Sequence, residues 1–170
     1  MDLIRKLLKW TLFPGLMVLL QALETVYGPA WRLWDAAPDF LTAYLVCAAC
    51  LEGPHPGALL GILAGVLRGS AADAGILLTP LYYAAGYLAG RLTRHRLRSC
   101  LPTALLLSLP PAMLAALAER LTPLFLGGAV RLTPALLGGI VLHGCLAAVV
   151  LWPLCRGVHS LGSPSREERL

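Results

Sequence analysis

The sequence predicts an all-α, polytopic integral membrane protein with about six transmembrane helices, two of them short, in a single compact bundle. The 170 residues are 58% hydrophobic and only 14% charged, whereas a soluble domain carries about 25% charged residues. The few charges also cluster and leave long uncharged runs between them. We expect residues 1–160 to form one membrane-embedded domain, and residues 161–170 to be a short, polar, disordered cytoplasmic tail.

Six uncharged runs define the expected spans. They cover residues 10–23, 40–51, 56–67, 74–90, 99–118 and 132–155. A spanning helix needs roughly 17 to 25 residues, so the last three runs suffice alone and the first suffices with its interfacial flanks. The second and third runs are short and are separated by EGPHPG, which leaves two short helices or one re-entrant pair. The first run follows the basic segment LIRKLLKW but lacks a small-residue cleavage site, so we expect a retained span.

The distribution of Lys and Arg predicts that both termini face the cytoplasm, because basic loops stay on that side. With six spans, ten of the 14 basic residues fall on the inner side. These are Arg5, Lys6, Lys9, Arg91, Arg94, Arg96, Arg98, Arg156, Arg166 and Arg169. The outer side holds Arg32, Arg68, Arg120 and Arg131. The net charge of +5 is then an inner-face charge and indicates no nucleic-acid partner.

The inner loop RLTRHRLR is the densest basic segment. It contains Arg91, Arg94, Arg96 and Arg98. Such a segment is typical of an anchor on anionic membrane lipid. Docking of a cytoplasmic partner is the alternative.

Glycine recurs at every fourth position in GALLGILAGVLRG. The residues are Gly57, Gly61, Gly65 and Gly69, and Gly86 and Gly90 repeat the spacing in the next run. A glycine inside a helix costs roughly 1 kcal/mol relative to alanine. In lipid, however, small residues let two helix backbones approach closely. The pattern therefore predicts a tight helix contact, with packing inside the chain favoured over contact with another protein.

Three polar residues are candidates for a role inside the membrane. Gln21 and Glu24 lie one turn apart near the outer end of the first span. Glu24 either pairs with an arginine such as Arg32 or Arg120 or lies in the headgroup region, and we favour the headgroup region. His143 stands alone in GIVLHGCL, where an ionisable group is expensive. A hydrogen bond to another helix is favoured over a functional role.

The sequence contains no recognisable catalytic or metal-binding pattern. Cys47 and Cys50 form the pair CAAC inside an apolar run, and no second pair completes a zinc site. HExxH, GxSxG, a phosphate-binding loop and paired intramembrane aspartates are missing from the sequence. We interpret the five cysteines as small apolar packing residues. The expectation is a protein with no enzymatic activity, no cofactor and no metal.

The order of motifs along the chain is also informative. A basic first helix with Gln21 is followed by a loop ending in APDF, a short helix reaching LEGPHPG, and the glycine-stepped helix. YYAAGYLAGRLTRHRLR comes next, and the last span closes on LWPLCRGV. Over most of residues 10–160 this series resembles the MreD family, the small membrane subunit of the bacterial rod-shape machinery.

The resemblance implies a non-enzymatic scaffold in the bacterial cytoplasmic (inner) membrane. Its implied partners are an MreC-like protein, a RodA-type glycosyltransferase with its penicillin-binding transpeptidase, and MreB filaments. The family often carries an aspartate at the end of the glycine-rich helix, whereas this chain has Arg68 near that place and Asp73 later. No role is therefore transferred to an acid there.

Two other classes of protein are weaker alternatives. The substrate-binding membrane subunit of a vitamin uptake transporter of the energy-coupling factor type has a similar size and similar glycine-rich helices. The first span here, WTLFPGLMVLLQALETVYG, lacks the alanine-x-x-x-alanine face through which such subunits dock their partner. A ligand pocket would also need more convergent polar side chains. An intramembrane enzyme would need an acid–base pair that the sequence does not supply.

Overall fold

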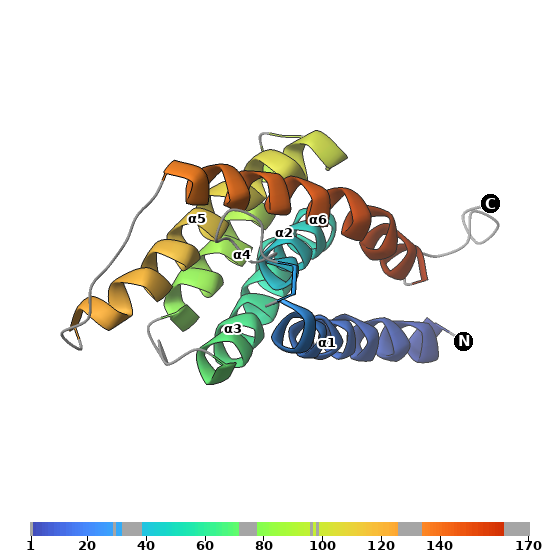
Figure 1. Cartoon of the computed structure of the whole chain (residues 1–170). Helices are drawn as coiled ribbons and strands as arrows, with labels where there is room; N and C mark the ends of the chain where they lie inside the picture. The colour runs from blue at the N-terminus through green and yellow to red at the C-terminus, as the bar shows by residue number, and fades with distance from the viewer. Residues whose placement is uncertain are drawn as a thin grey trace.

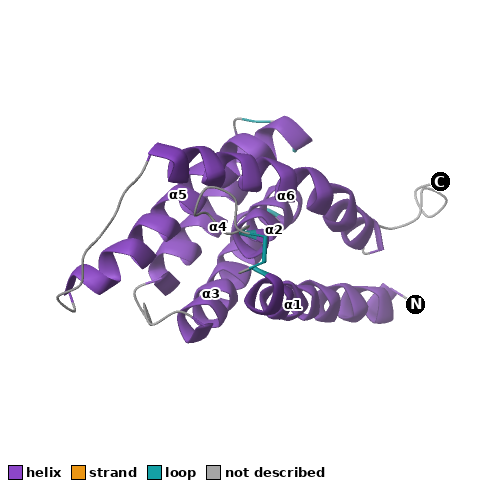
Figure 2. Cartoon of the chain, viewed as in Figure 1, coloured by secondary structure: helices purple, strands orange, loops and turns teal. Residues whose placement is uncertain are grey.

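The computed structural model describes residues 2–28, 30–31, 39–71, 78–95, 97, 99–125 and 134–161. The described residues form a bundle of helices (Figures 1 and 2). These are α1 (Asp2–Tyr27), α2 (Phe40–Glu52), α3 (Pro54–Ala71), α4 (Leu78–His95), α5 (Leu101–Phe125) and α6 (Pro134–Leu161). The all-α fold predicted from composition and uncharged runs is confirmed. The expected tail beyond residue 161 lies outside the described residues.

Three of the described helices are long and apolar enough to cross a membrane. The qualifying segments are Leu7–Tyr27 in α1, Leu101–Ala118 in α5 and Leu137–Leu161 in α6. Helix α2 is also apolar but has only 13 residues. Helices α3 and α4 are outside this group. Helix α3 combines one His and one Arg with two prolines and four glycines, and α4 ends in basic residues. The run 74–90 begins outside the described residues, which cover only its part 78–90, so its expected span stays a prediction.

Helix α2 lies at the centre of the bundle. It contacts each of the other five helices, with α6 passing above it and α1 below it in Figure 1. Every residue from Leu41 to Cys50 is buried, as expected of a helix that is apolar on all sides. The small residues of CAAC leave room for neighbours on several sides. The thiols of Cys47 and Cys155 meet there, between α2 and α6.

The turn between α2 and α3 depends on a glycine. Gly53 has a φ of 95°, in the left-handed region that glycine adopts without a steric penalty. Its N–H donates to the Ala49 carbonyl oxygen at 2.9 Å, and its own carbonyl accepts from the Gly57 N–H at 3.0 Å. The segment EGPHPG therefore contains the end of α2, a one-residue turn and the start of α3, an arrangement that fits two separate spans and a re-entrant pair equally.

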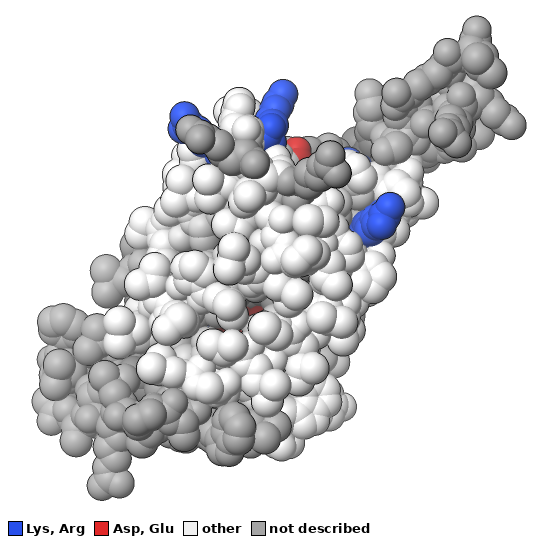
Figure 3. Space-filling model, turned by 90° about the horizontal axis from the view of Figure 1, so that it is seen from above, with Lys and Arg blue, Asp and Glu red and all other residues white. Residues whose placement is uncertain are grey.

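The outside of the bundle is apolar. Large side chains are well exposed on several helices, among them Leu59 on α3, Leu106 on α5 and Val150 on α6, each more than 60% exposed. Figure 3 shows a face that is largely free of charge across its middle, with Lys and Arg toward its margins. Such a surface is poorly suited to water and well suited to lipid.

The bundle has two chemically distinct ends. At one, which we call the Glu52 end, Glu52 of α2 meets Lys9 of α1 and His159 of α6. At the other, the Glu24 end, Glu24 of α1 meets Arg68 of α3. Consecutive helices therefore run in alternating directions between the two ends.

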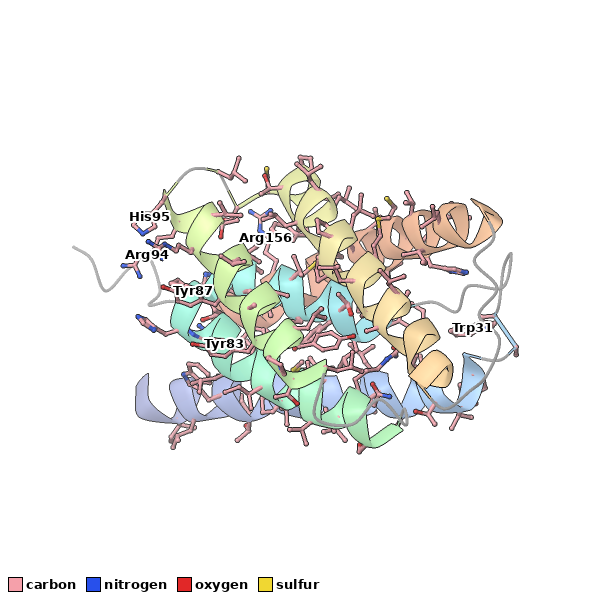
Figure 4. All side chains as sticks on the ribbon, turned by 90° about the vertical axis from the view of Figure 1, so that its left-hand side faces the viewer. Trp31, Tyr83, Tyr87, Arg94, His95 and Arg156 are labelled. Atoms are coloured by element: carbon pink, nitrogen blue, oxygen red, sulfur yellow. The ribbon has the colours of Figure 1, made fainter. Side chains whose placement is uncertain are left out.

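The same division is visible from the side. In Figure 4 Arg94 and His95, at the end of α4, lie toward one end of the molecule, and Trp31 lies at the other. Trp31 packs edge-on against Phe40 at the start of α2, with ring centroids 5.9 Å apart. An aromatic cluster therefore marks the Glu24 end, whereas basic residues mark the Glu52 end.

Candidate functional site

The tightest contact in the bundle is between α3 and α4, and glycines create it. A Cβ atom on Gly57 would lie 2.5 Å from the Gly86 carbonyl oxygen and 2.8 Å from the Ala49 Cβ. A Cβ atom on Gly90 would lie 2.5 Å from the Gly53 carbonyl oxygen. Because real Cβ atoms do not approach other atoms so closely, only glycine fits at these positions.

The contact continues along α3 toward the Glu24 end. A Cβ atom on Gly61 would collide with the backbone of Tyr82, and one on Gly65 would collide with the backbone of Thr79. Gly69 is half-buried in the last part of α3. The structure thus directs the first three glycines of the series at α4 of the same chain. Another protein could reach them only by displacing α4.

An ion pair joins α1 to α3 inside the bundle. The Glu24 carboxylate pairs with the Arg68 guanidinium, and their side chains are only 5% and 15% exposed. The second carboxylate oxygen accepts from the Leu41 N–H at 3.4 Å, which adds the start of α2. Glu24 thus pairs with an arginine, the alternative that the sequence analysis did not favour. Of the two arginines first considered, Arg32 lies outside the described residues, and the side chain of Arg120 is also outside them.

Sequence reasoning missed Arg68 as the partner of Glu24. The position of Arg68 could have indicated that it needs a partner. It is a basic residue that the topology assigns to the outer side, against the positive-inside rule, and it follows an apolar stretch. A charge in that place needs a partner or an interfacial position. Glu24 satisfies that need.

The other polar residues singled out in the spans are also buried. Gln21 is 8% exposed, and its Nε2 lies 3.4 Å from the Thr25 hydroxyl. Its Oε1 is buried and has no hydrogen-bond partner among the described residues. His143 is 7% exposed within α6. It therefore lies inside the bundle rather than on the lipid-facing surface.

A hydrogen-bonded group links the start of α2 to α4. Asp39 caps α2, where its Oδ1 accepts from the Thr42 N–H at 3.0 Å. The Thr42 hydroxyl lies 2.5 Å from Asp39 Oδ2 and 3.0 Å from the Tyr82 hydroxyl. Thr42 and Tyr82 are fully buried. Polar atoms that would be costly in an apolar bundle thus satisfy one another.

At the opposite end, one carboxylate joins three helices. Lys9 Nζ lies 2.6 Å from Glu52 Oε2, and His159 Nδ1 lies 2.6 Å from Glu52 Oε1. The Glu52 side chain is 8% exposed. The sequence analysis assigned no role to these residues as a group. The sequence did contain a signal: Glu52 directly follows the uncharged run 40–51, on the side where basic residues gather.

The basic loop is described only in part. Arg91 and Arg94 are exposed on the last turns of α4, at the Glu52 end. Arg96 and Arg98 lie outside the described residues. Arg91 Nη1 donates to the Tyr87 hydroxyl at 3.3 Å, and its guanidinium lies 5.9 Å from the centre of the Tyr87 ring.

The buried polar groups act mainly as connections between helices. Among the described residues, no three His, Cys, Asp or Glu side chains are grouped to hold a metal ion. No protein-family model, curated protein or solved structure matches the chain. The MreD-like assignment accordingly stays a prediction from the order of motifs.

Proposed function

We propose that this chain is a non-enzymatic membrane scaffold of the bacterial cell-elongation machinery, as its resemblance to the MreD family implies. The observation that carries the proposal is how the bundle uses its polar residues. Glu24 and Glu52 are each bonded to other helices of the same chain. With the glycine contact between α3 and α4, these bonds favour a rigid body.

The exterior of that body is suited to holding other membrane proteins. It presents large apolar side chains on α3, α5 and α6, on which lipid or a partner helix can pack. The proposed partners are an MreC-like protein, a RodA-type glycosyltransferase, its penicillin-binding transpeptidase, and MreB filaments. In this role the chain would connect peptidoglycan synthesis to the filaments without doing chemistry.

The proposed location is the bacterial cytoplasmic membrane, with both termini in the cytoplasm. The gathering of Lys9, Arg91 and Arg94 at the Glu52 end supports this orientation, because basic residues favour the cytoplasmic side. MreB filaments would then be reached from the Glu52 end. The wall-synthesis enzymes would be met within the membrane or at the Glu24 end.

Depletion in a rod-shaped host tests the function. We expect rounded, widened cells, and we expect the solubilised protein to co-purify with an MreC-like protein. Because no catalytic role is assigned to the cysteine pair or to His143, Cys47→Ala/Cys50→Ala and His143→Gln should restore rod shape. A rod shape unaffected by depletion would contradict the proposal. Co-purification with a transporter ATPase and a bound vitamin would favour the transporter subunit instead.

A further inference from the structure

A hollow of about 580 Å³ opens on α4 at the Glu52 end. The described residues that line it are Leu88, Arg91, Leu92 and His95. Positions three and four apart lie on one face of a helix, so the four side chains form a single wall. Leu88 lies nearest the middle of the bundle and His95 nearest its end. The wall therefore combines apolar and cationic surface within two helical turns.

The guanidinium in this wall is held in place. Arg91 lies over the ring of Tyr87 and donates one N–H to the Tyr87 hydroxyl. The Tyr87 ring in turn stacks on Tyr83, with centroids 6.4 Å apart and ring planes 6° from parallel. Figure 4 shows both tyrosines on α4 on the way to His95. Arginine carries five N–H donors in a planar fork, so the bond to Tyr87 leaves donors for a ligand.

We propose that this hollow binds one anionic phospholipid, with its phosphate on Arg91 and His95 and an acyl chain along Leu88 and Leu92. A guanidinium fork matches a phosphate in charge and in geometry. A soluble phosphate compound would leave the two leucines in contact with water. A neutral lipid would leave the Arg91 guanidinium without a counter-charge. An anionic amphiphile uses all four residues. The site does not depend on the scaffold role and can be tested without it.

The binding test uses the full-length chain in detergent, titrated with phosphatidylglycerol or with diacylglycerol, which lacks the phosphate, and analysed by native mass spectrometry. We expect one phosphatidylglycerol to bind at least about tenfold more tightly than diacylglycerol, since a charge-assisted hydrogen bond to the phosphate contributes enough for that ratio. Arg91→Gln should weaken phosphatidylglycerol binding about tenfold on the same grounds. His95→Gln should weaken phosphatidylglycerol binding less than Arg91→Gln does. The imidazole of His95 offers a single N–H to the phosphate, whereas the guanidinium of Arg91 offers several.

Arg94 provides a matched control. It is exposed on the same helix, and Arg94→Gln removes the same charge, but Arg94 is not among the described residues that line the hollow. We expect Arg94→Gln to leave the affinity within about twofold of the parent, because Arg94 does not line the hollow. An equal loss in Arg94→Gln and Arg91→Gln would overturn the proposal, because binding would then follow surface charge alone. The melting temperature of each variant shows that the fold is kept.

Two further measurements distinguish a lipid from a soluble phosphate ligand. Leu88→Ser should weaken phosphatidylglycerol binding while leaving any binding of inorganic phosphate unchanged. Millimolar inorganic phosphate or glycerol phosphate should fail to displace phosphatidylglycerol, because neither contacts the leucines. Displacement by either compound, or unchanged lipid binding in Leu88→Ser, would show that the hollow recognises only the phosphate and would overturn the lipid assignment.

Discussion

Glu24 on α1 and Arg68 on α3 form an ion pair inside the bundle, at the point where α2 begins. The two residues are 44 positions apart in the chain. A buried charge is stable only when it is paired and hydrogen-bonded. The pair therefore fixes the positions of α1 and α3 relative to each other, and the bond to Leu41 adds α2.

Removing one member of this pair should destabilise the fold strongly. Glu24→Gln leaves the Arg68 guanidinium without its carboxylate, and breaking a buried pair in this way costs about 3–5 kcal/mol. The free energy of unfolding in mixed detergent micelles measures the loss. The double variant Glu24→Gln/Arg68→Met should be more stable than Glu24→Gln alone, since the uncompensated charge is gone. Equal stability of Glu24→Gln and the parent would contradict a buried pair.

The Glu52 carboxylate, at the other end of the bundle, should stabilise the packing of α1 and α6 against α2. Glu52→Gln weakens the contacts to both Lys9 and His159, so it should destabilise more than Lys9→Gln or His159→Gln alone. Lys9 is more deeply buried than His159, with side chains 13% and 36% exposed. Lys9→Gln should therefore cost more than His159→Gln. Thermal unfolding of the purified variants gives the order of their melting temperatures. A reversed order would contradict the stabilising role of the Glu52 carboxylate.

Adjacent tyrosines on α4 provide a sharp comparison. Tyr82 is fully buried and its hydroxyl lies 3.0 Å from the Thr42 hydroxyl. Tyr82→Phe should therefore cost about 1 kcal/mol of unfolding free energy, the usual value of one hydrogen bond. Tyr83 is 45% exposed and stacks on Tyr87 through its ring, which phenylalanine keeps. Tyr83→Phe should be neutral. The same loss in both variants would contradict a specific bond to Thr42.

The helical class of the protein could be predicted because it follows from local features of the sequence. Uncharged runs and a shortage of surface charge depend only on residue type and order, so they indicated a helical membrane bundle. The glycine spacing likewise indicated a close helix contact. It did not indicate that the contact would be with α4, because many helix faces can accept a glycine strip.

The pairing of charges could not be predicted for a related reason. Which acid meets which base depends on how helices are arranged, and residues such as Lys9, Glu52 and His159 are far apart in the chain. The central position of α2 also depends on how the helices are arranged in space. Its uniformly apolar sequence suits burial among helices and exposure to lipid equally well, so only the packing of its five neighbours decides between them.

Reporter fusions test the proposed orientation in the membrane. Ten of the 14 basic residues are assigned inside, so fusions after Arg98 and at the C-terminus should both report the cytoplasm. A fusion near Arg32 should report the outer side. A cytoplasmic report from the Arg32 fusion, or an outer report from the Arg98 fusion, would contradict the six-span topology.

Substitution of the α3 glycines should separate α3 from α4. In Gly61→Ala the new methyl group meets the backbone of Tyr82, which cannot rotate away as a side chain can. Such overpacking costs about 1–3 kcal/mol, and Gly61→Leu or Gly65→Leu should cost more. Membrane insertion should survive, because alanine and leucine are more favourable in a membrane helix than glycine. Membrane fractionation measures insertion, and unfolding in detergent measures the stability of the inserted protein.

Gly157 on α6 provides the matched control for these variants. A Cβ atom there meets nothing within 4 Å, so Gly157→Ala should leave stability unchanged or raise it by up to about 1 kcal/mol through helix propensity. Both changes replace a helical glycine with alanine, so they alter helix propensity equally. A difference in stability between Gly61→Ala and Gly157→Ala therefore cannot come from helix propensity. If the two variants are equally stable, the backbone contact between α3 and α4 is not what requires glycine. If only Gly61→Ala is destabilised and also fails to co-purify with the proposed MreC-like partner, rigid packing of α3 on α4 is needed for the proposed scaffold to hold that partner.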